Sequence, residues 1–466
     1  MNEKLARALS HIDGRYIAAA AEKKKKRRKG WLIAVAAVLT LAMVIAIPNM
    51  PLAVTAKAVS RASDARKLDR PRYGTEEFDL WREQNDLRNQ KLSAAKLPLA
   101  AFSGTSSSHI LSGTEGENAV WSPLNAYLAL GMTAELAAGH TRQDLLQVLG
   151  VDSVATMRNH AAALWETVYE DNGLEICVPA SSVWLDKDLR YHREVMDVLA
   201  YDYYASVYQG QLGSDRTNRD ITNWLNNQTG GFLKDRTGQV SLVPNSMLAL
   251  VSTIYFQGQW DTKFAKENNT QGIFHAPGGD VSCTYMNARL RQMNYYWDPD
   301  FSAVRLSMEN GSTMWLILPD EDKTVDDVLQ RGSYMDLIAN TGAFPKESSK
   351  WMKVNLSLPQ FDISADTDLE PGLSEMGLEE IFCPVGNNFS AGFDTDLPVY
   401  LDNIRQSTRV AIDEEGVTAA SYILLQFGAG SAAPPEEIID FVLDRPFLFA
   451  ITSSSVPLFV GVVNTP

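Results

Sequence analysis

No arrangement of side chains in this sequence matches a familiar catalytic motif. The chain lacks G-x-S-x-G, H-E-x-x-H and any glycine-rich phosphate loop. The spacing Asp366-x-Asp368-x-Glu370 hints at calcium, but the glycine and final glutamate of an EF-hand are absent, so a solvated acidic turn is the better interpretation. The six histidines form no recognisable motif; they are His11, His109, His140, His160, His192 and His275. The sequence therefore predicts no enzyme, no metal site and no cofactor.

A strand-like stretch near the C-terminus is chemically more distinctive. Val410 and Ile412 alternate with small or charged neighbours, as in a strand, before residues 413–415 interrupt the pattern. Gly416 is a natural pivot, because a residue without a Cβ adopts backbone angles that others cannot. Residues 417–421 are uncharged and contain no proline, so they could enter a sheet interior. The pattern predicts a strand that is kept out of its sheet.

The sequence Glu414-Glu415-Gly416-Val417-Thr418-Ala419-Ala420 resembles the reactive-loop hinge of the serpins, the serine protease inhibitor family. Further similar motifs follow the family's order over residues 97–466; they include Ser122-Pro123, Gly139-His140-Thr141, Asn223-Trp224, Leu248 to Trp260, Trp315 to Asp320, Phe441 to Phe449 and Pro457 to Asn464. The resemblance implies an α+β serpin fold with three β-sheets, eight or nine helices and an exposed reactive-centre loop. We expect a bacterial-type member of the family.

Composition limits the classes of function that fit. Hydrophobic residues make up 45% of the 466, enough for a sizeable core. The three cysteines form no CxxC, so neither a zinc site nor a disulfide-dense scaffold is predicted. Residues 1–30 carry a net charge of +7, which leaves −22 on residues 31–466 of a chain whose total is −15. An acidic body does not suit nucleic acid, whose binding requires neutralisation of phosphates.

The N-terminal part of the chain predicts a membrane anchor. Residues 1–30 are a basic segment and residues 31–47 an uncharged, mostly apolar stretch at the short end for a membrane span. The positive-inside rule places 1–30 in the cytoplasm, 48–96 outside as a spacer, and the 97–466 domain beyond it. The alternative is secretion after cleavage near Ala58, where Ala56-Lys57-Ala58 resembles a signal-peptidase site.

The resemblance also implies a mechanism and a partner. The target serine protease would attack the loop and form a covalent complex with a monomeric inhibitor, while the cut loop inserts into the sheet. Counting fourteen residues from the hinge glycine gives Gly430-Ser431 as the reactive bond, with Phe427-Gly428 and Ala429-Gly430 as rivals. These residues favour elastase-, chymotrypsin- or subtilisin-like proteases. The alternative function is that of a non-inhibitory serpin acting as a cell-surface binding module.

The predicted centre of the main sheet departs from the usual serpin pattern. Gln406 occupies the position of a histidine, Ser252 that of an asparagine and Asn125 that of a second serine, whereas Ser122 is kept. Because buried polar groups need partners, we expect a rebuilt cluster with Gln406 and Asn125 as amide partners. The alternative is that these are ordinary polar residues of a sheet interior. Trp260 is expected where the loop would enter the sheet.

Overall fold

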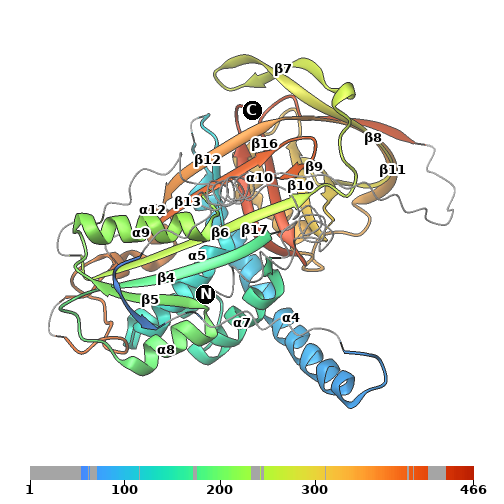
Figure 1. Cartoon of the computed structure of the whole chain (residues 1–466). Helices are drawn as coiled ribbons and strands as arrows, with labels where there is room; N and C mark the ends of the chain where they lie inside the picture. The colour runs from blue at the N-terminus through green and yellow to red at the C-terminus, as the bar shows by residue number, and fades with distance from the viewer. Residues whose placement is uncertain are drawn as a thin grey trace, which may run out of the picture. The chain divides into compact units, whose positions relative to one another are not determined.

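In the computed structural model, the strands of residues 53–466 form two β-sheets (Figure 1). The residues described are 54–60, 62, 71–114, 116–171, 176–231, 242, 246–309, 311–395, 398–401, 404–417 and 437–466. The predicted cytoplasmic segment 1–30 and membrane helix 31–47 lie outside them. Within these ranges, no helix is both long and apolar enough to cross a membrane.

The first sheet holds the predicted hinge. Its strands pair in the order β1 (Lys57–Ser60), β5 (Ala205–Gly210), β4 (Ile176–Asp186), β6 (Leu248–Gln259), β14 (Gly416–Val417), β13 (Arg405–Ile412) and β12 (Phe361–Asp368), with β3 (Glu170–Asp171) paired to β4. Strand β14 is antiparallel to both of its neighbours, so β6 and β13 run parallel to each other. In the described part of the chain, only these two residues of β14 pair between them.

The second sheet contains nine strands. It combines strands that the sequence analysis expected to form two separate sheets. Its strands pair in the order β15 (Ile438–Val442), β11 (Ser349–Pro359), β8 (Gly279–Trp297), β9 (Phe301–Ser307), β10 (Ser312–Pro319), β16 (Phe447–Ser453), β17 (Val456–Val463) and β2 (Ala119–Trp121), with β7 (Thr270–Ala276) paired to β8. Strand β8 pairs with β7 along its first half and with β9 at its end. This shared long strand joins two smaller sheets into one.

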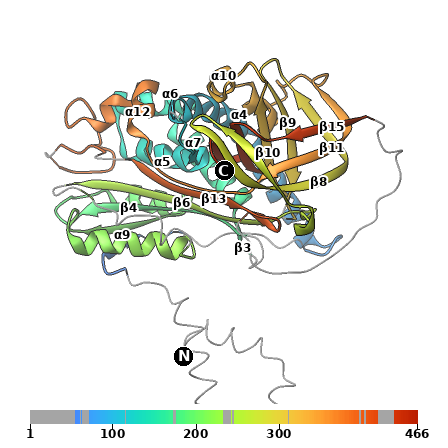
Figure 2. The same ribbon diagram turned by 90° about the horizontal axis from the view of Figure 1, so that it is seen from above.

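Nine α-helices lie in the described ranges. They are α4 (Glu76–Leu111), α5 (Pro123–Leu136), α6 (Gly139–Val148), α7 (Val154–Val168), α8 (Arg193–Asp202), α9 (Asp215–Gln228), α10 (Val325–Arg331), α11 (Ser333–Ile338) and α12 (Glu370–Leu373). As expected from its apolar sequence, α5 is buried at every residue, and it packs against both β6 and β17. Helix α9 covers the opposite face of the first sheet (Figure 2).

The predicted spacer contributes two elements to this unit. Helix α4 is capped by the Thr75 side chain and runs on for 36 residues, past Pro98, so residues 76–96 form its first part. Strand β1 pairs antiparallel with β5, and the Ser60 hydroxyl donates to Asp197 at 2.7 Å. We call residues 54–60 the N-terminal strap. The folded unit therefore also includes residues of the predicted spacer 48–96.

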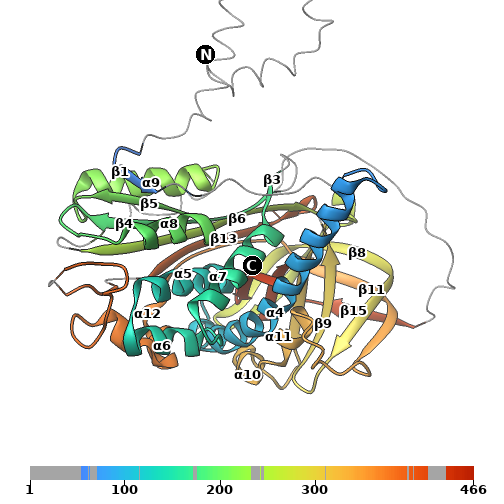
Figure 3. The ribbon, with the colours of Figure 1, turned by 90° about the horizontal axis from the view of Figure 1, so that it is seen from below.

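The N-terminal strap ties the edge of the sheet to α9 (Figure 3). The backbone N–H and the hydroxyl of Thr55 donate to the two carboxylate oxygens of Asp220 at 2.9 and 2.8 Å. Asp220 is only 3% exposed, and Arg216 of the same helix donates to the Thr55 hydroxyl. Val54 and Ala56 pack against the small core beneath α9. The hydrogen bonds to this buried carboxylate thus fix the position of the N-terminal strap against α9.

Substituting Asp220→Ala should detach the strap from α9. Two hydrogen bonds to a charged acceptor are lost, which we expect to destabilise the unit by about 2 kcal/mol. Urea denaturation followed by circular dichroism measures this as a lower midpoint. The control is Arg219→Ala, since Arg219 is exposed on the same helix. Equal midpoints for the two variants would show that the strap contributes nothing.

Candidate functional site

The predicted hinge begins as a tight turn that leads from β13 into β14. The Asp413 carboxylate accepts hydrogen bonds from the backbone N–H groups of Glu415 at 2.9 Å and Gly416 at 3.2 Å. The Asp413 N–H donates to the Gly416 carbonyl at 3.0 Å. An aspartate that bonds the backbone two and three residues ahead stabilises a turn. The turn sends the chain back between β13 and β6.

Two glutamates attach this turn to its surroundings. Glu414 is only 7% exposed, and one of its carboxylate oxygens accepts hydrogen bonds from the amides of Asn269 and Gln360. Glu415 forms an ion pair with Lys263 at 2.8 Å. A carboxylate that is buried away from water needs hydrogen-bond donors to replace its hydration. These partners therefore hold the Glu414 side chain in this position.

Trp260 contacts the hinge directly, where loop entry was predicted. Its backbone N–H donates to the Glu415 carbonyl at 3.0 Å and its indole Nε1–H to the Asp413 carbonyl at 2.8 Å. The ring is 1% exposed and packs edge-on against Phe264, whose N–H donates to the Glu414 carbonyl. The end of β6 and the turn are therefore held together by three backbone-directed hydrogen bonds.

A glycine is required at position 416 because the backbone of β6 leaves no room for a Cβ, and not because the residue has an unusual backbone angle. A Cβ at this position would lie 2.2 Å from the Gly258 carbonyl oxygen of β6 and 2.8 Å from the Cα of Gln259. Its φ is not in the left-handed region, so the conformational reason expected from the sequence does not apply. Val417, 2% exposed, pairs with Gly258 on one side and Ile412 on the other. The first two residues after the turn already occupy the seam between β6 and β13.

The polar cluster forms around Ser122, with a different pairing from the one predicted. The amide of buried Gln406 accepts from the Ser122 N–H and donates to the Ser122 carbonyl at 3.1 Å. It therefore satisfies the backbone at the start of α5 instead of pairing with Asn125, whose Oδ1 is buried without a partner. The Ser122 hydroxyl caps α5 by accepting from the Asn125 N–H. Ser252 lies half-buried on β6, opposite Ser181 of β4.

Some predicted residues cannot be placed, and some residues of the site were not predicted. Thr418, Ala419, Ala420, Gly430 and Ser431 lie outside the described residues. Conversely, Lys263, Asn269 and Gln360 hold the two glutamates from 152, 145 and 54 positions away in the sequence. Lone polar residues at such distances give no local signal, so only the fold could have assigned them. Within the described ranges, no group of His, Cys, Asp or Glu side chains could hold a metal ion.

Comparison with known proteins identifies the family. The family model described as "Serpin (serine protease inhibitor)" matches residues 99–466. The chain belongs to the serpin family. Putative serpin-Z12 of Oryza sativa is 26% identical over 79% of this chain and 90% of its own length. Plasminogen activator inhibitor 1 of Sus scrofa is 26% identical over 77% and 89%, and alaserpin of Manduca sexta 24% over 78% and 92%. These plant and animal relatives do not support a bacterial type.

Solved serpin structures share the fold. Tengpin, a thermophilic serpin in its native state, matches 88% of this chain and all of its own with a TM-score of 0.70 and 22% identity. Arabidopsis AtSerpin1, in what is described as a native stressed conformation, matches 82% and 98% with a TM-score of 0.68 and 22% identity. The serpin fold expected from the sequence is therefore confirmed.

Substituting Gly416→Ala should push β14 out of the seam, because the added methyl would overlap the β6 backbone. We expect the amides of Trp260 and Phe264, which donate to the hinge, to exchange hydrogen about tenfold faster. Hydrogen exchange read by mass spectrometry measures this. The control is Gly278→Ala, whose new methyl would meet no atom within 4 Å. Wild-type exchange rates in Gly416→Ala would contradict the spatial role assigned to this glycine.

Proposed function

We propose that this serpin is a suicide inhibitor of serine proteases that traps its target covalently by inserting its reactive loop into the first sheet. The observation that carries the proposal is β14. Its two residues already pair with β6 and β13 in the orientation that a longer inserted strand would continue. The description of the family supports the activity class, which is inhibition of serine proteases. The seam between β6 and β13 supports the path by which the cut loop would enter the sheet.

The seam is suited to accept a strand. Strands β6 and β13 run parallel, and no ladder joins them directly within the described residues. A strand placed between them is antiparallel to both, which is the direction in which the chain leaves Gly416. The following residues 417–421 are uncharged, so their burial involves no unpaired charge.

Insertion would release enough free energy to deform a protease. Each new backbone hydrogen bond contributes ~0.5–1.5 kcal/mol net. Ten or more such bonds, together with the burial of small apolar side chains, give on the order of 10 kcal/mol. The uncut loop cannot reach this state, so the active form would be kinetically trapped. The related AtSerpin1, described as natively stressed, supports a metastable active form here.

The chemical step belongs to the target. Its serine Oγ attacks the carbonyl carbon of the residue before the reactive bond; an ester forms and the peptide nitrogen leaves as an amine with a proton. The segment that begins at Gly416 is then tethered at one end only and inserts with the protease attached. Deformation of the protease precedes hydrolysis of the ester. The serpin therefore acts as a substrate whose turnover is arrested.

The sequence of the loop defines the class of target that we propose. The chain has no Arg or Lys between Gly416 and Pro434, so a trypsin-like pocket has no side chain to bind. Cleavage at Gly430-Ser431 suits a narrow, elastase-like pocket, and cleavage after Phe427 suits a chymotrypsin- or subtilisin-like one. The competing function is a non-inhibitory binding module, against which the buried, uncharged Val417 argues.

We also propose that the domain is held at the outer face of a membrane by residues 31–47. The basic segment before this stretch and the acidic domain after it support that orientation. Cleavage near Ala58, the alternative, would cut within β1 and separate Thr55 from the rest of the chain. The N-terminal residue of the mature protein, determined by sequencing, should precede Val54. An N-terminus after Ala58 would establish secretion instead.

A protease panel tests the inhibitory mechanism. The serpin is titrated with elastase-, chymotrypsin-, subtilisin- and trypsin-like proteases, and the products are read on denaturing gels with mass spectrometry of the released peptide. We expect a band near the summed masses with at least one non-trypsin-like protease, and a peptide mass that fixes the reactive bond. Cleavage without this band across the panel would favour the binding module.

The variant Val417→Arg separates loop cleavage from loop insertion. A charge at this buried position must either be desolvated or hold β14 out of the seam. Cleavage should continue while the covalent band falls about tenfold or more, so that the inhibitor becomes a substrate. The matched control is Val385→Arg, because Val385 is 82% exposed. An unchanged yield of covalent complex in Val417→Arg would refute insertion through this seam.

A further inference from the structure

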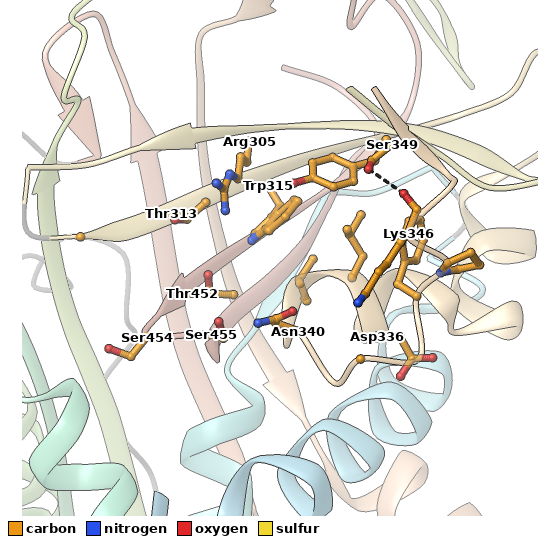
Figure 4. Close-up of a pocket in the computed structure, with 17 residues that line it drawn as sticks. Arg305, Thr313, Trp315, Asp336, Asn340, Lys346, Ser349, Thr452, Ser454 and Ser455 are labelled. Carbon is orange, nitrogen blue, oxygen red and sulfur yellow. Dashed lines mark hydrogen bonds between the residues drawn. The ribbon is translucent and has the colours of Figure 1, made fainter. Parts of the chain in front are cut away.

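Helix α4 has two parts with different surroundings. Residues 95–111 contribute eight buried side chains and pack against α11, which lines the cavity in Figure 4 with Asp336. Residues 76–94 extend away from the sheets and the other helices (Figure 1), and Phe78 is the one buried residue among them. The serpin family model begins to match at residue 99, so this first part lies outside the matched segment.

Exposed leucines form a stripe on the first part of α4. Leu80 and Leu87 are 60% and 54% exposed, and Leu97, just beyond this part, is 59% exposed. Leu80, Leu87 and Ala94 follow one another at steps of seven residues, and Leu97 comes three residues later. Steps of seven and three keep side chains on the contact face of a helix, as in a coiled coil. We call residues 76–97 the α4 arm and these four residues its leucine stripe.

The α4 arm lacks the packing that usually stabilises a helix. Between Phe78 and Ala95 no side chain is buried. Most of the stability of helices in proteins comes from a packed apolar face. In addition, Asp79 and Glu83 place like charges one turn apart, which destabilises an isolated helix. Contact between the leucine stripe and another molecule would supply the missing packing.

The charges of the arm are separated along its length. Residues 76–86 contain five acidic side chains and one basic one, a net charge of −4, whereas residues 87–97 contain three basic side chains and no acidic one, a net charge of +3. The helix dipole favours acidic side chains at the N-terminus, but it gives no preference for cations in the middle of a 36-residue helix. The arm is therefore complementary in charge to a second arm that runs in the opposite direction.

A groove on the acidic half of the arm indicates what a partner must carry. Its described lining consists of the leucines and polar side chains of this half, which are Glu76, Asp79, Leu80, Arg82, Glu83, Asp86, Leu87 and Gln90. An apolar strip flanked by cations fits such a groove. The basic half of a second arm is such a strip, since its stripe residues Ala94 and Leu97 are accompanied by Arg88, Lys91 and Lys96. A parallel pair would instead place acidic half against acidic half.

We propose that two copies of this chain associate through their α4 arms, which pack antiparallel and cross near Leu87. Each leucine stripe covers the other, and the acidic half of each arm lies along the basic half of its partner. A two-fold axis relates the copies, so one patch serves both sides of the contact. Glu83 and Gln90 interrupt the stripe, so the dimer is weak and reversible.

The dimer presents two reactive loops on one particle. The monomer expected from the resemblance then describes residues 97–466, whereas the full-length chain pairs. The contact uses no residue of the hinge, so it stands whether or not the chain inhibits a protease.

Cysteine cross-linking in the full-length chain tests the contact and its direction. Leu87→Cys places a thiol at the crossing point, so oxidation with copper phenanthroline should join two copies by a disulfide, seen as a dimer band on non-reducing gels. Leu80→Cys should not cross-link to itself, because in an antiparallel pair these positions lie about 20 Å apart. A mixture of Leu80→Cys and Ala94→Cys should cross-link. The control is Val385→Cys, since Val385 is 82% exposed and outside the arm.

Charge variants in the Leu87→Cys background test the complementarity. Glu83→Lys with Asp86→Lys neutralises the acidic half, and Arg88→Glu with Lys91→Glu makes the basic half acidic. Each double variant alone should lower the yield of cross-linked dimer about tenfold or more. Mixing the two should restore much of the yield, because an acidic half then meets a basic half again. Circular dichroism confirms that each variant is folded.

Three results would overturn the proposal. The first is that Leu87→Cys gives no more dimer than Val385→Cys. The second is that Leu80→Cys cross-links to itself as efficiently as Leu87→Cys, which indicates a parallel pair. The third is that the charge variants give the same yield as their parent.

Discussion

The close approach of two backbones, at Gly416 of β14 and Gly258 of β6, sets the arrangement of the functional part of this molecule. With no side chain on Gly416, the chain turns after β13 and enters the seam beside β6. The turn is fixed from inside by Asp413, and from outside by Trp260, Lys263, Asn269 and Gln360. In the described residues, the chain that leaves this turn pairs with the sheet over two residues, Gly416 and Val417. In the part of the chain that the structure describes, β6 and β13 have no strand between them beyond these two residues.

The rest of the first sheet supports this seam from both sides. Beneath it, Gln406 satisfies both backbone groups of Ser122, which ties β13 to the buried helix α5 through a dry contact. Above it, α9 crosses the opposite face and is bonded through Asp220 to the N-terminal strap. Insertion of a full strand would have to widen a sheet whose edge and covering helix are tied together. The N-terminal chain is thus bonded to the helix that covers the sheet into which we propose that the loop inserts.

The sequence by itself determined the family, the fold class and the place where the chain turns after β13. Hydrophobic periodicity, caps such as Ser122-Pro123 and the run of small residues after Gly416 are local signals, and local signals can be recognised along the chain. The tertiary structure decided the pairing of the polar residues, the reason for Gly416 and the place of the N-terminal strap. Gln406 bonds to Ser122, 284 positions away, and Thr55 to Asp220, 165 positions away. Such contacts depend on which strand edges and helix ends the fold brings together, and single polar residues carry no trace of that in their neighbours.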